Sequence, residues 1–337
     1  MTRPSVFEIK GGGLTMAVTD YGARVVSLRV PDRKGRLDDI CVGYATLQEY
    51  LDCPGERFFG AAVGRLANRL GGGSFTLDGK KYHTARNDHG NTLHGGFTGI
   101  DRALWKVVAR TEDSIMLALR DPAGSDGWPG NLDIELRYTL TEDSAFKVEY
   151  KAWTDAPTLC NLSHHTFFNL TGDVSKPILD HILQIEADRF IPTDDKLIPT
   201  GEIRSVAGTP HDFRRAKRIG QDIVAKDEQL LRAGGYDHNW CLYEGKGIRR
   251  AATLYEPVSG RRMEVWTDQS GLQFYSGNFF DGSYAGKGGQ TIGHRCALAL
   301  ETQAWPDAIH HPAFPNTVLR PGETYIHTCI YKFGVSL

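Results

Sequence analysis

Leu132-Asp-Ile-Glu-Leu-Arg-Tyr-Thr-Leu-Thr-Glu-Asp-Ser-Ala-Phe-Lys-Val-Glu-Tyr-Lys-Ala-Trp153 is a stretch in which apolar and polar side chains alternate over most of its length. The alternation is broken at Thr141-Glu-Asp-Ser144, a run of polar residues. Alternation of this kind is typical of half-buried strands, because successive side chains of a strand point to opposite faces of the sheet. The stretch therefore predicts two strands joined by a short turn.

The same pattern recurs elsewhere in the chain. Residues 14–30 read as two strands around Asp20-Tyr-Gly22, and residues 251–267 read as two strands around Ser259-Gly260. In Ser74–His83 the dipeptide Asp78-Gly79 supplies the positive φ values of a type I′ turn between alternating flanks, which is a hairpin signature. Strand pairs closed by tight turns are therefore expected to be the main building unit.

Helical periodicity is scarce, and residues 46–51 and 219–232 are the only candidates, both short. Runs of strands without alternating helices exclude a doubly wound parallel sheet, and the absence of a fixed-period repeat argues against a propeller. We expect an all-β fold, a large antiparallel β-sandwich. Length alone suggests two domains, but no Pro/Ser-rich linker divides the chain, so a single domain over residues 1–337 is expected.

Composition excludes several classes of protein. Charged residues make up 24% of the chain, the net formal charge is −2, and Lys and Arg are scattered among Asp and Glu. This argues against nucleic-acid or membrane-surface partners. The N-terminal residues contain no signal-peptide-like apolar stretch and no later segment could span a bilayer, so a cytoplasmic protein is expected. The six cysteines form no Cys-x-x-Cys and are expected to be reduced, mostly buried thiols rather than zinc ligands or disulfides.

Asn161-Leu-Ser-His-His-Thr-Phe-Phe-Asn169 is the strongest candidate for chemistry. On a strand, His164 and His165 point to opposite faces, so they cannot chelate one ion together. A single inward imidazole suits proton transfer near neutral pH. The alternative is a hydrogen-bonded core histidine.

Glu301 follows the apolar run Ala297-Leu-Ala-Leu300, which reads as a strand buried on both faces. An ionisable side chain at the end of such a strand is costly unless it is paired or used. Trp305, four residues later, either offers an aromatic face to a sugar or closes the loop.

Four further positions suit the binding of a polyol, although each has a structural alternative. Arg69 can bind hydroxyls or be a surface cation, and the same alternatives hold for Arg65. His94 precedes two glycines, which would leave its ring exposed. Asp237 can accept from two neighbouring hydroxyls or make an Asx-turn. Gln273 is a second diol reader or a polar edge residue. Polar, Gly-rich stretches at 86–102, 121–131, 171–181 and 281–295 are expected to be long loops over one sheet.

Together these motifs resemble the aldose 1-epimerases, also called galactose mutarotases. The resemblance runs from near residue 5 to Phe333 and rests on six motifs in order: Asn68-Arg69, Asn91-Thr-Leu-His94-Gly-Gly, Asn161-Leu-Ser-His-His165-Thr-Phe-Phe-Asn, Gly235-Tyr-Asp237-His-Asn, Gln273-Phe-Tyr-Ser-Gly-Asn and Leu300-Glu301-Thr-Gln-Ala-Trp-Pro-Asp. It implies the galactose-mutarotase type of β-sandwich, no cofactor or metal, and a monomer or weak homodimer. It also assigns roles: His165 as general acid, Glu301 as general base, and as sugar-binding residues Asn68, Arg69, His94, Asp237 and Gln273. One departure is His164, where family members often carry Asn.

The implied reaction interconverts the α and β anomers of free aldohexoses such as glucose and galactose. A base takes the proton of the C1 hydroxyl while an acid protonates the ring oxygen; the ring opens, the aldehyde rotates, and the ring closes on its other face. For this cycle to start, His165 must be protonated at neutral pH, and a nearby carboxylate is expected to keep it so.

Three other functions remain open from the sequence. A non-catalytic sugar-binding module should lack Glu301 or His165, and both are present. A hexose-6-phosphate 1-epimerase should carry extra Arg or Lys for the phosphate. The only basic cluster, residues 214–218, reads as a solvated face. A glycosidase would need two carboxylates about the scissile bond, which Asp237 and Glu301 could supply.

Overall fold

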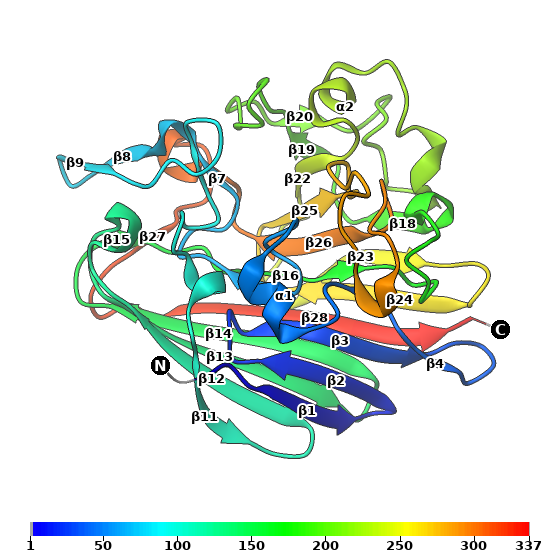
Figure 1. Cartoon of the computed structure of the whole chain (residues 1–337). Helices are drawn as coiled ribbons and strands as arrows, with labels where there is room; N and C mark the ends of the chain where they lie inside the picture. Colours follow the sequence, from blue (N-terminus) through cyan, green and yellow to red (C-terminus); the bar gives the residue numbers. More distant parts are fainter. Residues whose placement is uncertain (1–2, 337) are drawn as a thin grey trace.

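The computed structural model of the chain describes residues 3–336, and its strands pair in antiparallel ladders throughout the three larger sheets (Figure 1). The largest sheet has nine strands in the order β11 (Lys106–Arg110), β12 (Ser114–Asp121), β13 (Leu132–Thr141), β14 (Ala145–Thr154), β28 (Tyr325–Val335), β24 (Arg261–Thr267), β23 (Arg249–Tyr255), β18 (Ile182–Ile185) and β21 (Lys217–Arg218). The antiparallel all-β prediction is confirmed.

Two further sheets complete the main layers. A seven-stranded sheet has the order β20 (Arg204–Ser205), β19 (Arg189–Ile191), β22 (Asp237–Cys241), β25 (Gly271–Tyr275), β26 (Leu298–Gln303), β17 (Phe167–Phe168) and β5 (Cys41–Val42). A four-stranded sheet has the order β1 (Val6–Gly11), β2 (Leu14–Thr19), β3 (Arg24–Pro31) and β4 (Leu37–Asp39). Figure 1 shows β1 to β3, in blue, lying against the long strands of the nine-stranded sheet.

The described residues also form four two-stranded ladders and two short α-helices. The ladders join β6 (Ala61–Val63) to β16 (Ser163–His165), β7 (Arg69–Leu70) to β10 (Thr92–Leu93), β8 (Ser74–Leu77) to β9 (Lys80–His83), and β15 (Thr158–Leu159) to β27 (Val318–Leu319). The helices are α1 (Leu47–Asp52) and α2 (Glu228–Ala233). Short 3₁₀ turns are η1 (Gly71–Gly73), η2 (Ile100–Arg102), η3 (Ser125–Gly127), η4 (Ile178–Asp180), η5 (Ile219–Gln221), η6 (Lys287–Gly289) and η7 (Ala308–His310).

One cluster of buried apolar side chains joins the three larger sheets. Alternate residues of β13 are buried, as the opening stretch predicts, so one face of this strand packs inward and the other meets solvent. By contrast every residue of β26 is buried, because this strand lies between β25 and β17 and is covered on both faces. The hydroxyl of Tyr331 on β28 donates to the carbonyl of Leu300 on β26 at 3.0 Å, which ties the two layers together.

The predicted turns are confirmed in detail. Asp78 and Gly79 both have positive φ, 50° and 77°, between β8 and β9. The first predicted helix is α1, where Thr46 Oγ1 accepts from the backbone N–H of Glu49 and Glu49 accepts from the N–H of Thr46, a capping box. The helix then ends at Cys53, which has φ 50° and turns the chain into a loop over residues 53–58.

The second predicted helix, over residues 219–232, is only partly correct. The segment forms η5 and, separately, α2, with irregular chain between them. Asp227 caps α2 by accepting from the backbone N–H groups of Gln229 and Leu230, so the α-helix begins only after this residue. Of residues 3–336, none belongs to a helix with the length and apolar character needed to cross a bilayer.

Candidate active site

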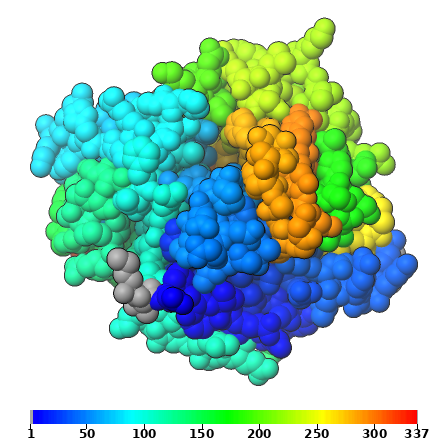
Figure 2. Space-filling model, in the orientation of Figure 1, coloured from blue at the N-terminus to red at the C-terminus, as the bar shows by residue number. Residues whose placement is uncertain are grey.

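A cavity of about 250 Å³ opens among the loops beside the seven-stranded sheet. Figure 2 shows segments near residues 55, 90 and 280, in blue, cyan and orange, gathered on one face of the molecule. The residues that line the cavity are Gly55, Glu56, Arg57, Phe58, Asn68, Arg69, Leu93, His94, His165, Asp237, Tyr275, Phe279 and Glu301. Residues far apart in the sequence therefore converge on one small volume.

Strand register sets the floor of the cavity. Gln273 on β25 stands directly opposite Glu301 on β26. Asp237, at the start of β22, pairs with Tyr275 of β25. His165 enters from β16, whose Ser163 hydroxyl donates to the carbonyl of Thr302 on β26 at 2.9 Å. Each of these side chains is thus placed by a paired or bonded strand rather than by a free loop.

His165 Nε2 lies 3.4 Å from Glu301 Oε1. Both side chains are buried. Among residues 3–336 neither His165 Nδ1 nor Glu301 Oε2 has a hydrogen-bond partner. A buried polar atom without a partner is unfavourable, so these atoms gain if a polar ligand enters.

A second group of side chains lies along the wall that Asp237 supplies. Arg69 is ion-paired with Asp88 at 2.8 Å and lies 3.6 Å from Asp237. Gln273 Nε2 donates to Asp237 Oδ1 at 2.7 Å, which leaves Gln273 Oε1 buried and unpartnered in residues 3–336. The group offers both donors and acceptors at fixed positions, as recognition of neighbouring hydroxyls requires.

His94 is held in one tautomer. Its Nδ1 accepts a hydrogen bond from the backbone N–H of Asn68 at 3.1 Å, so the ring proton belongs on Nε2 and is available to donate. The ring packs on Phe58, with centroids 4.5 Å apart. Burial and the nearby His165, Arg69 and Arg57 hold the pKa of His94 well below its usual value, so the ring is neutral.

The comparison of the sequence with known families decides the relationship. The sequence model of the family described as aldose 1-epimerase matches residues 5–332. The chain belongs to the aldose 1-epimerase family.

Relatives of this family agree with the assignment. The chain is 40% identical over 330 residues to the human galactose mutarotase, covering 98% of this chain and 94% of that protein. It is 36% identical over 324 residues to the Escherichia coli aldose 1-epimerase, covering 95% and 92%. A solved structure of the GalM/aldose epimerase homologue from C. elegans, 30% identical, superposes with a TM-score of 0.92 over 99% of this chain and 100% of that one. The predicted galactose-mutarotase type of β-sandwich is confirmed, and the chain is an isomerase of this epimerase family.

All seven residues to which the family resemblance gives a role lie together. Those on the cavity wall are Asn68, Arg69, His94, His165, Asp237 and Glu301. Gln273 lies one layer back, in a recess of about 10 Å³ whose walls also include Asn68 and Asp237. Of the four expected binding loops, the one at 86–102 supplies wall residues and the other three do not.

The residues with open alternatives divide between the site and the scaffold. His164 faces away from the cavity, packs between Tyr138 and Phe146, and bonds Thr166 through Nδ1, so the two histidines do point to opposite faces. Arg65 is buried and bonded to Asp121 at 2.8 Å. Trp305 donates to the carbonyl of Ser270 and closes a loop. These three residues therefore hold the fold.

The loop over residues 53–58 is the larger part of the wall that the sequence did not reveal, and Phe279 is the other. Glu56, Arg57 and Phe58 line the cavity, yet no recognised motif includes them. The only local signal is Pro54-Gly55, which marks a turn after α1 but says nothing of what the turn approaches. Their position depends on long-range contacts, above all that of Arg57 with Asp101 at 2.7 Å.

One electrostatic expectation, that a nearby carboxylate keeps His165 charged, is wrong. Burial lowers the pKa of His165 to about 3, so the imidazole is neutral at neutral pH. The carboxylate that was expected to hold it charged is itself affected by burial. Burial, reinforced by Asp237 and Glu56, raises the pKa of Glu301 well above its usual value, and Arg69 opposes the rise. Burial therefore favours the uncharged form of both groups.

His94, His165 and Glu301 have the residue types of a metal site, with potential ligand atoms all within 4.8 Å of one another. A metal on Nε2 of a neutral imidazole needs the proton on Nδ1. In His94, Nδ1 faces the N–H of Asn68, so a proton there would place two donors against each other. The trio therefore fits a hydrogen-bonding ligand better than a cation.

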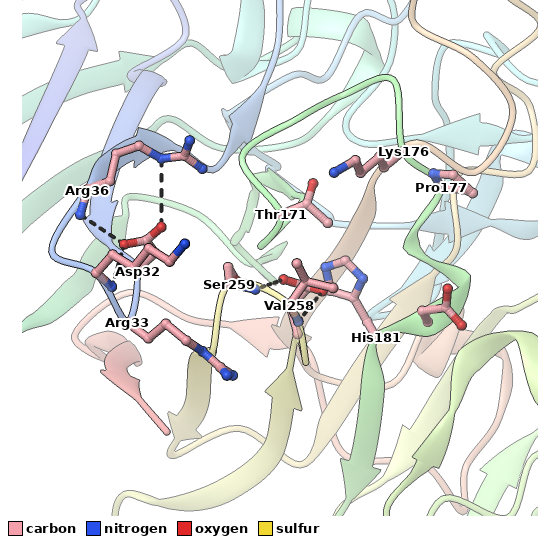
Figure 3. Close-up of a pocket in the computed structure, with 12 residues that line it drawn as sticks. Asp32, Arg33, Arg36, Thr171, Lys176, Pro177, His181, Val258 and Ser259 are labelled. Carbon is pink, nitrogen blue, oxygen red and sulfur yellow. Dashed lines mark hydrogen bonds and ion pairs between the residues drawn. The ribbon is translucent and has the colours of Figure 1, made fainter. Parts of the chain in front are cut away.

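A larger cavity, of about 480 Å³, lies elsewhere in the fold and contains none of the predicted site residues. Figure 3 shows it between the turn at residues 32–36, the loop at 171–181 and the turn after Glu256. Its buried carboxylates are engaged within the protein: Asp32 accepts from the N–H groups of Lys34 and Arg36, and Glu256 accepts from those of Val258 and Ser259. These two carboxylates therefore stabilise the turns in which they lie.

Proposed function

We propose that the chain interconverts the α and β anomers of free aldohexoses such as glucose and galactose, with Glu301 and His165 as the proton-transfer pair. The observation that carries this proposal is the 3.4 Å separation of His165 Nε2 and Glu301 Oε1 in one buried cavity. Two groups so close can each reach one of two oxygens bonded to the same carbon. In an aldopyranose those are the C1 hydroxyl and the ring oxygen.

The proposed cycle conserves its protons. Glu301 as carboxylate takes the proton of the C1 hydroxyl, protonated His165 gives its proton to the ring oxygen, and the bond from C1 to the ring oxygen breaks. The open-chain aldehyde then rotates about the C1–C2 bond and closes on its other face, with each group reversing its role. A positioned proton transfer contributes roughly 10²- to 10⁴-fold in rate.

The charge state of the pair suits this cycle. Ring opening converts a charged pair into a neutral one, and burial favours the uncharged form of both groups. The charged form needs only a proton shift from Glu301 to His165 across the 3.4 Å gap, without exchange with solvent. A single proton therefore serves the pair throughout.

The remaining wall residues suit the proposed role of binding the sugar. Asp237 would accept from neighbouring hydroxyls, and Gln273, one layer behind the wall, would hold Asp237 through its Nε2–H. Arg69 and the Nε2–H of His94 would donate, and Asn68 would hold His94 in its tautomer. Phe58 and Tyr275 add aromatic surface for the C–H groups of the ring.

Free sugars are favoured over hexose phosphates. The two arginines of the cavity are engaged with carboxylates, Arg57 with Asp101 and Arg69 with Asp88. In the basic cluster at 214–218, Arg214, Lys217 and Arg218 pair with Asp212, Asp222 and Asp180, and none of the cluster lines the cavity. A phosphate would thus find no free cation among the described residues of the wall.

Polarimetry tests the proposal directly. Freshly dissolved α-glucose and α-galactose should approach their equilibrium rotation much faster with the protein than without it, and glucose 6-phosphate should show little acceleration. Equal acceleration of all three would favour the hexose-phosphate alternative. Binding of a sugar without any acceleration would favour a non-catalytic sugar-binding module.

We also infer that residues 1–337 form one domain, because a single buried cluster draws side chains from all three larger sheets. Limited proteolysis should leave no stable fragment corresponding to a half of the chain.

A further inference from the structure

Glu56 is a carboxylate of the cavity wall that the proposed reaction does not use. It stands with Gly55, Arg57 and Phe58 on the loop between α1 and β6, and these four consecutive residues form one side of the cavity. Because the cavity is about 250 Å³, a bound pyranose would lie within reach of this side as well as of Glu301. The position alone makes Glu56 a possible contact of the sugar.

The loop holds Glu56 firmly. The carbonyl of Glu56 accepts from the hydroxyl of Tyr44 at 3.0 Å, and the same hydroxyl accepts from the N–H of Gly55 at 3.0 Å. Glu56 Oε1 accepts from the N–H of Phe58 at 2.7 Å. Next to it, Arg57 donates to both oxygens of buried Asp101 and to the carbonyl of Gly96. The carboxylate is therefore pre-positioned before any ligand arrives.

The other oxygen of Glu56 remains available. Within residues 3–336, Oε2 has no hydrogen-bond partner and no Lys, Arg or His forms an ion pair with the carboxylate. Arg57 is adjacent in sequence but its bonds go to Asp101 and Gly96. Burial raises the pKa of Glu56, with the N–H of Phe58 and the charges of Arg24 and Arg57 opposing the rise. A half-buried carboxylate in this state gains from a ligand that supplies a hydroxyl donor.

We propose that Glu56 is a specificity-determining residue, whose carboxylate accepts a hydrogen bond from a hydroxyl of the bound sugar. This inference rests on the proposed function, because it assumes that the cavity holds an aldose. The loop after α1, which carries none of the recognised motifs, would then contribute to the choice of sugar. The charge of Glu56 also acts on Glu301, since it is one of the causes that raise the pKa of that base.

Deoxy sugars test the contact. The variants are Glu56→Ala and Glu56→Gln, and the matched control is Asp52→Asn, which removes a carboxylate from the exposed end of α1 outside the cavity. The kcat/KM is measured for glucose and for its 2-, 3-, 4- and 6-deoxy forms. For glucose, Glu56→Ala should lower kcat/KM about 10- to 100-fold, the range for a lost hydrogen bond to a charged group. For the one deoxy sugar that lacks the contacted hydroxyl, the same variant should change kcat/KM less than about 3-fold.

The pH profile gives a second readout that a purely structural role would not move. Because the charge of Glu56 raises the pKa of Glu301, Glu56→Gln should shift the alkaline limb of kcat/KM to lower pH, and Asp52→Asn should leave it in place. An equal loss for glucose and every deoxy sugar, or wild-type kinetics in Glu56→Ala, would overturn the proposal.

Calorimetric binding separates this inference from the proposed reaction. If the wild-type protein binds glucose but does not accelerate anomer exchange, the proposed function fails, and the same comparison made with Kd in place of kcat/KM still decides the role of Glu56. If the wild-type protein binds neither glucose nor any deoxy form, the role of Glu56 is refuted together with the function. Thermal unfolding of each variant shows whether a loss of activity or binding results only from a loss of folded structure.

Discussion

His164 and His165 are adjacent in sequence but differ completely in surroundings. His165 reaches Glu301 in the cavity, whereas His164 lies between the rings of Tyr138 and Phe146. Replacing each histidine in turn therefore distinguishes a role in proton transfer from a role in packing. His165→Asn should lower kcat by roughly 10²- to 10⁴-fold, because a positioned proton transfer is lost. His164→Asn should leave kcat within a few-fold of the wild type and change mainly the melting temperature.

Glu301→Gln provides the complementary change, since it keeps the size of the side chain and removes its capacity as a base. We expect a loss of kcat similar to that of His165→Asn, with glucose still bound in calorimetry. The double variant should lose little more than either single one, because both groups take part in the same step of the proposed cycle. Near-normal turnover in Glu301→Gln would rule out this base.

The pH dependence of kcat/KM follows from the buried pair. With ordinary pKa values, near 4.3 and 6.5, the pair would hold exactly one proton only between those limits, and activity would fall above about pH 6.5. Burial exchanges the order of the two limits, because it lowers the pKa of His165 to about 3 and raises the pKa of Glu301. The pair therefore loses its proton when Glu301 deprotonates, and this deprotonation sets the alkaline limb of the kcat/KM profile.

Replacing Arg69 tests the direction in which a nearby charge shifts the pKa of Glu301. Its positive charge lowers the pKa of Glu301, so removing it raises that pKa further. In Arg69→Ala the alkaline limb of kcat/KM should move to higher pH, besides a general loss of sugar binding. Stopped-flow polarimetry with correction for the uncatalysed reaction measures both. A limb that stays in place while thermal stability alone changes would make Arg69 a structural residue.

At the scale of elements, the turn after β10 shows how backbone geometry places a side chain. His94 has φ 47°, and Gly95 follows with φ 91°. A Cβ on Gly95 would lie 2.0 Å from the carbonyl oxygen of Gly64, which is backbone and cannot rotate away. Gly95 is therefore required both for its positive φ and for this close approach.

Gly95→Ala should accordingly displace His94, lower kcat/KM by at least about 10-fold and reduce the free energy of unfolding by more than the roughly 1 kcal/mol typical of a glycine at positive φ. Gly79→Ala is the matched control, because Gly79 has φ 77° but open space around it. The control should lose only about 1 kcal/mol and keep full activity. Similar losses in both variants would mean that His94 does not depend on this contact.

The elements also show what sequence patterns can and cannot predict. The alternation in β13 and β14 and the turn at Asp78-Gly79 are local, so the sequence predicts them well. Burial of Glu301 follows from the apolar run before it. The loop at 53–58 has no periodicity, and its place in the wall depends on Asp101, more than 40 residues away in the chain. Such a position results from tertiary packing and has no local signature.

At the scale of the whole molecule, seven buried histidines share one electrostatic property. Burial lowers the pKa of each of them, and the group comprises His94, His164, His165, His181, His211, His238 and His327. The sequence shows twelve histidines but not which ones are buried. Which histidines are buried depends on the packing of the whole sandwich. The effect of these buried histidines on the pH dependence of stability therefore depends on it as well.

This effect is a loss of stability on acidification. Between the unfolded pKa, about 6.5, and the lower folded values, the unfolded chain binds protons that the native protein does not. Stability is therefore fully present above about pH 6.5 and falls as the pH drops below it, by at most about 1.4 kcal/mol per pH unit for each such histidine. Carboxylates with raised pKa, such as Glu301 and Asp101, oppose this trend but are fewer.

The melting temperature should consequently fall steeply between pH 6.5 and 5, at constant ionic strength. Replacing His211, which has no hydrogen-bond partner at either ring nitrogen within residues 3–336 and stacks on Phe190, by Phe should make this fall shallower. The exposed His89 provides the control, because His89→Phe removes an imidazole that is open to solvent and should leave the slope unchanged. A melting temperature that is flat over this range would show that these imidazoles are hydrated or protonated in the native protein, and that the buried sandwich tolerates their charge.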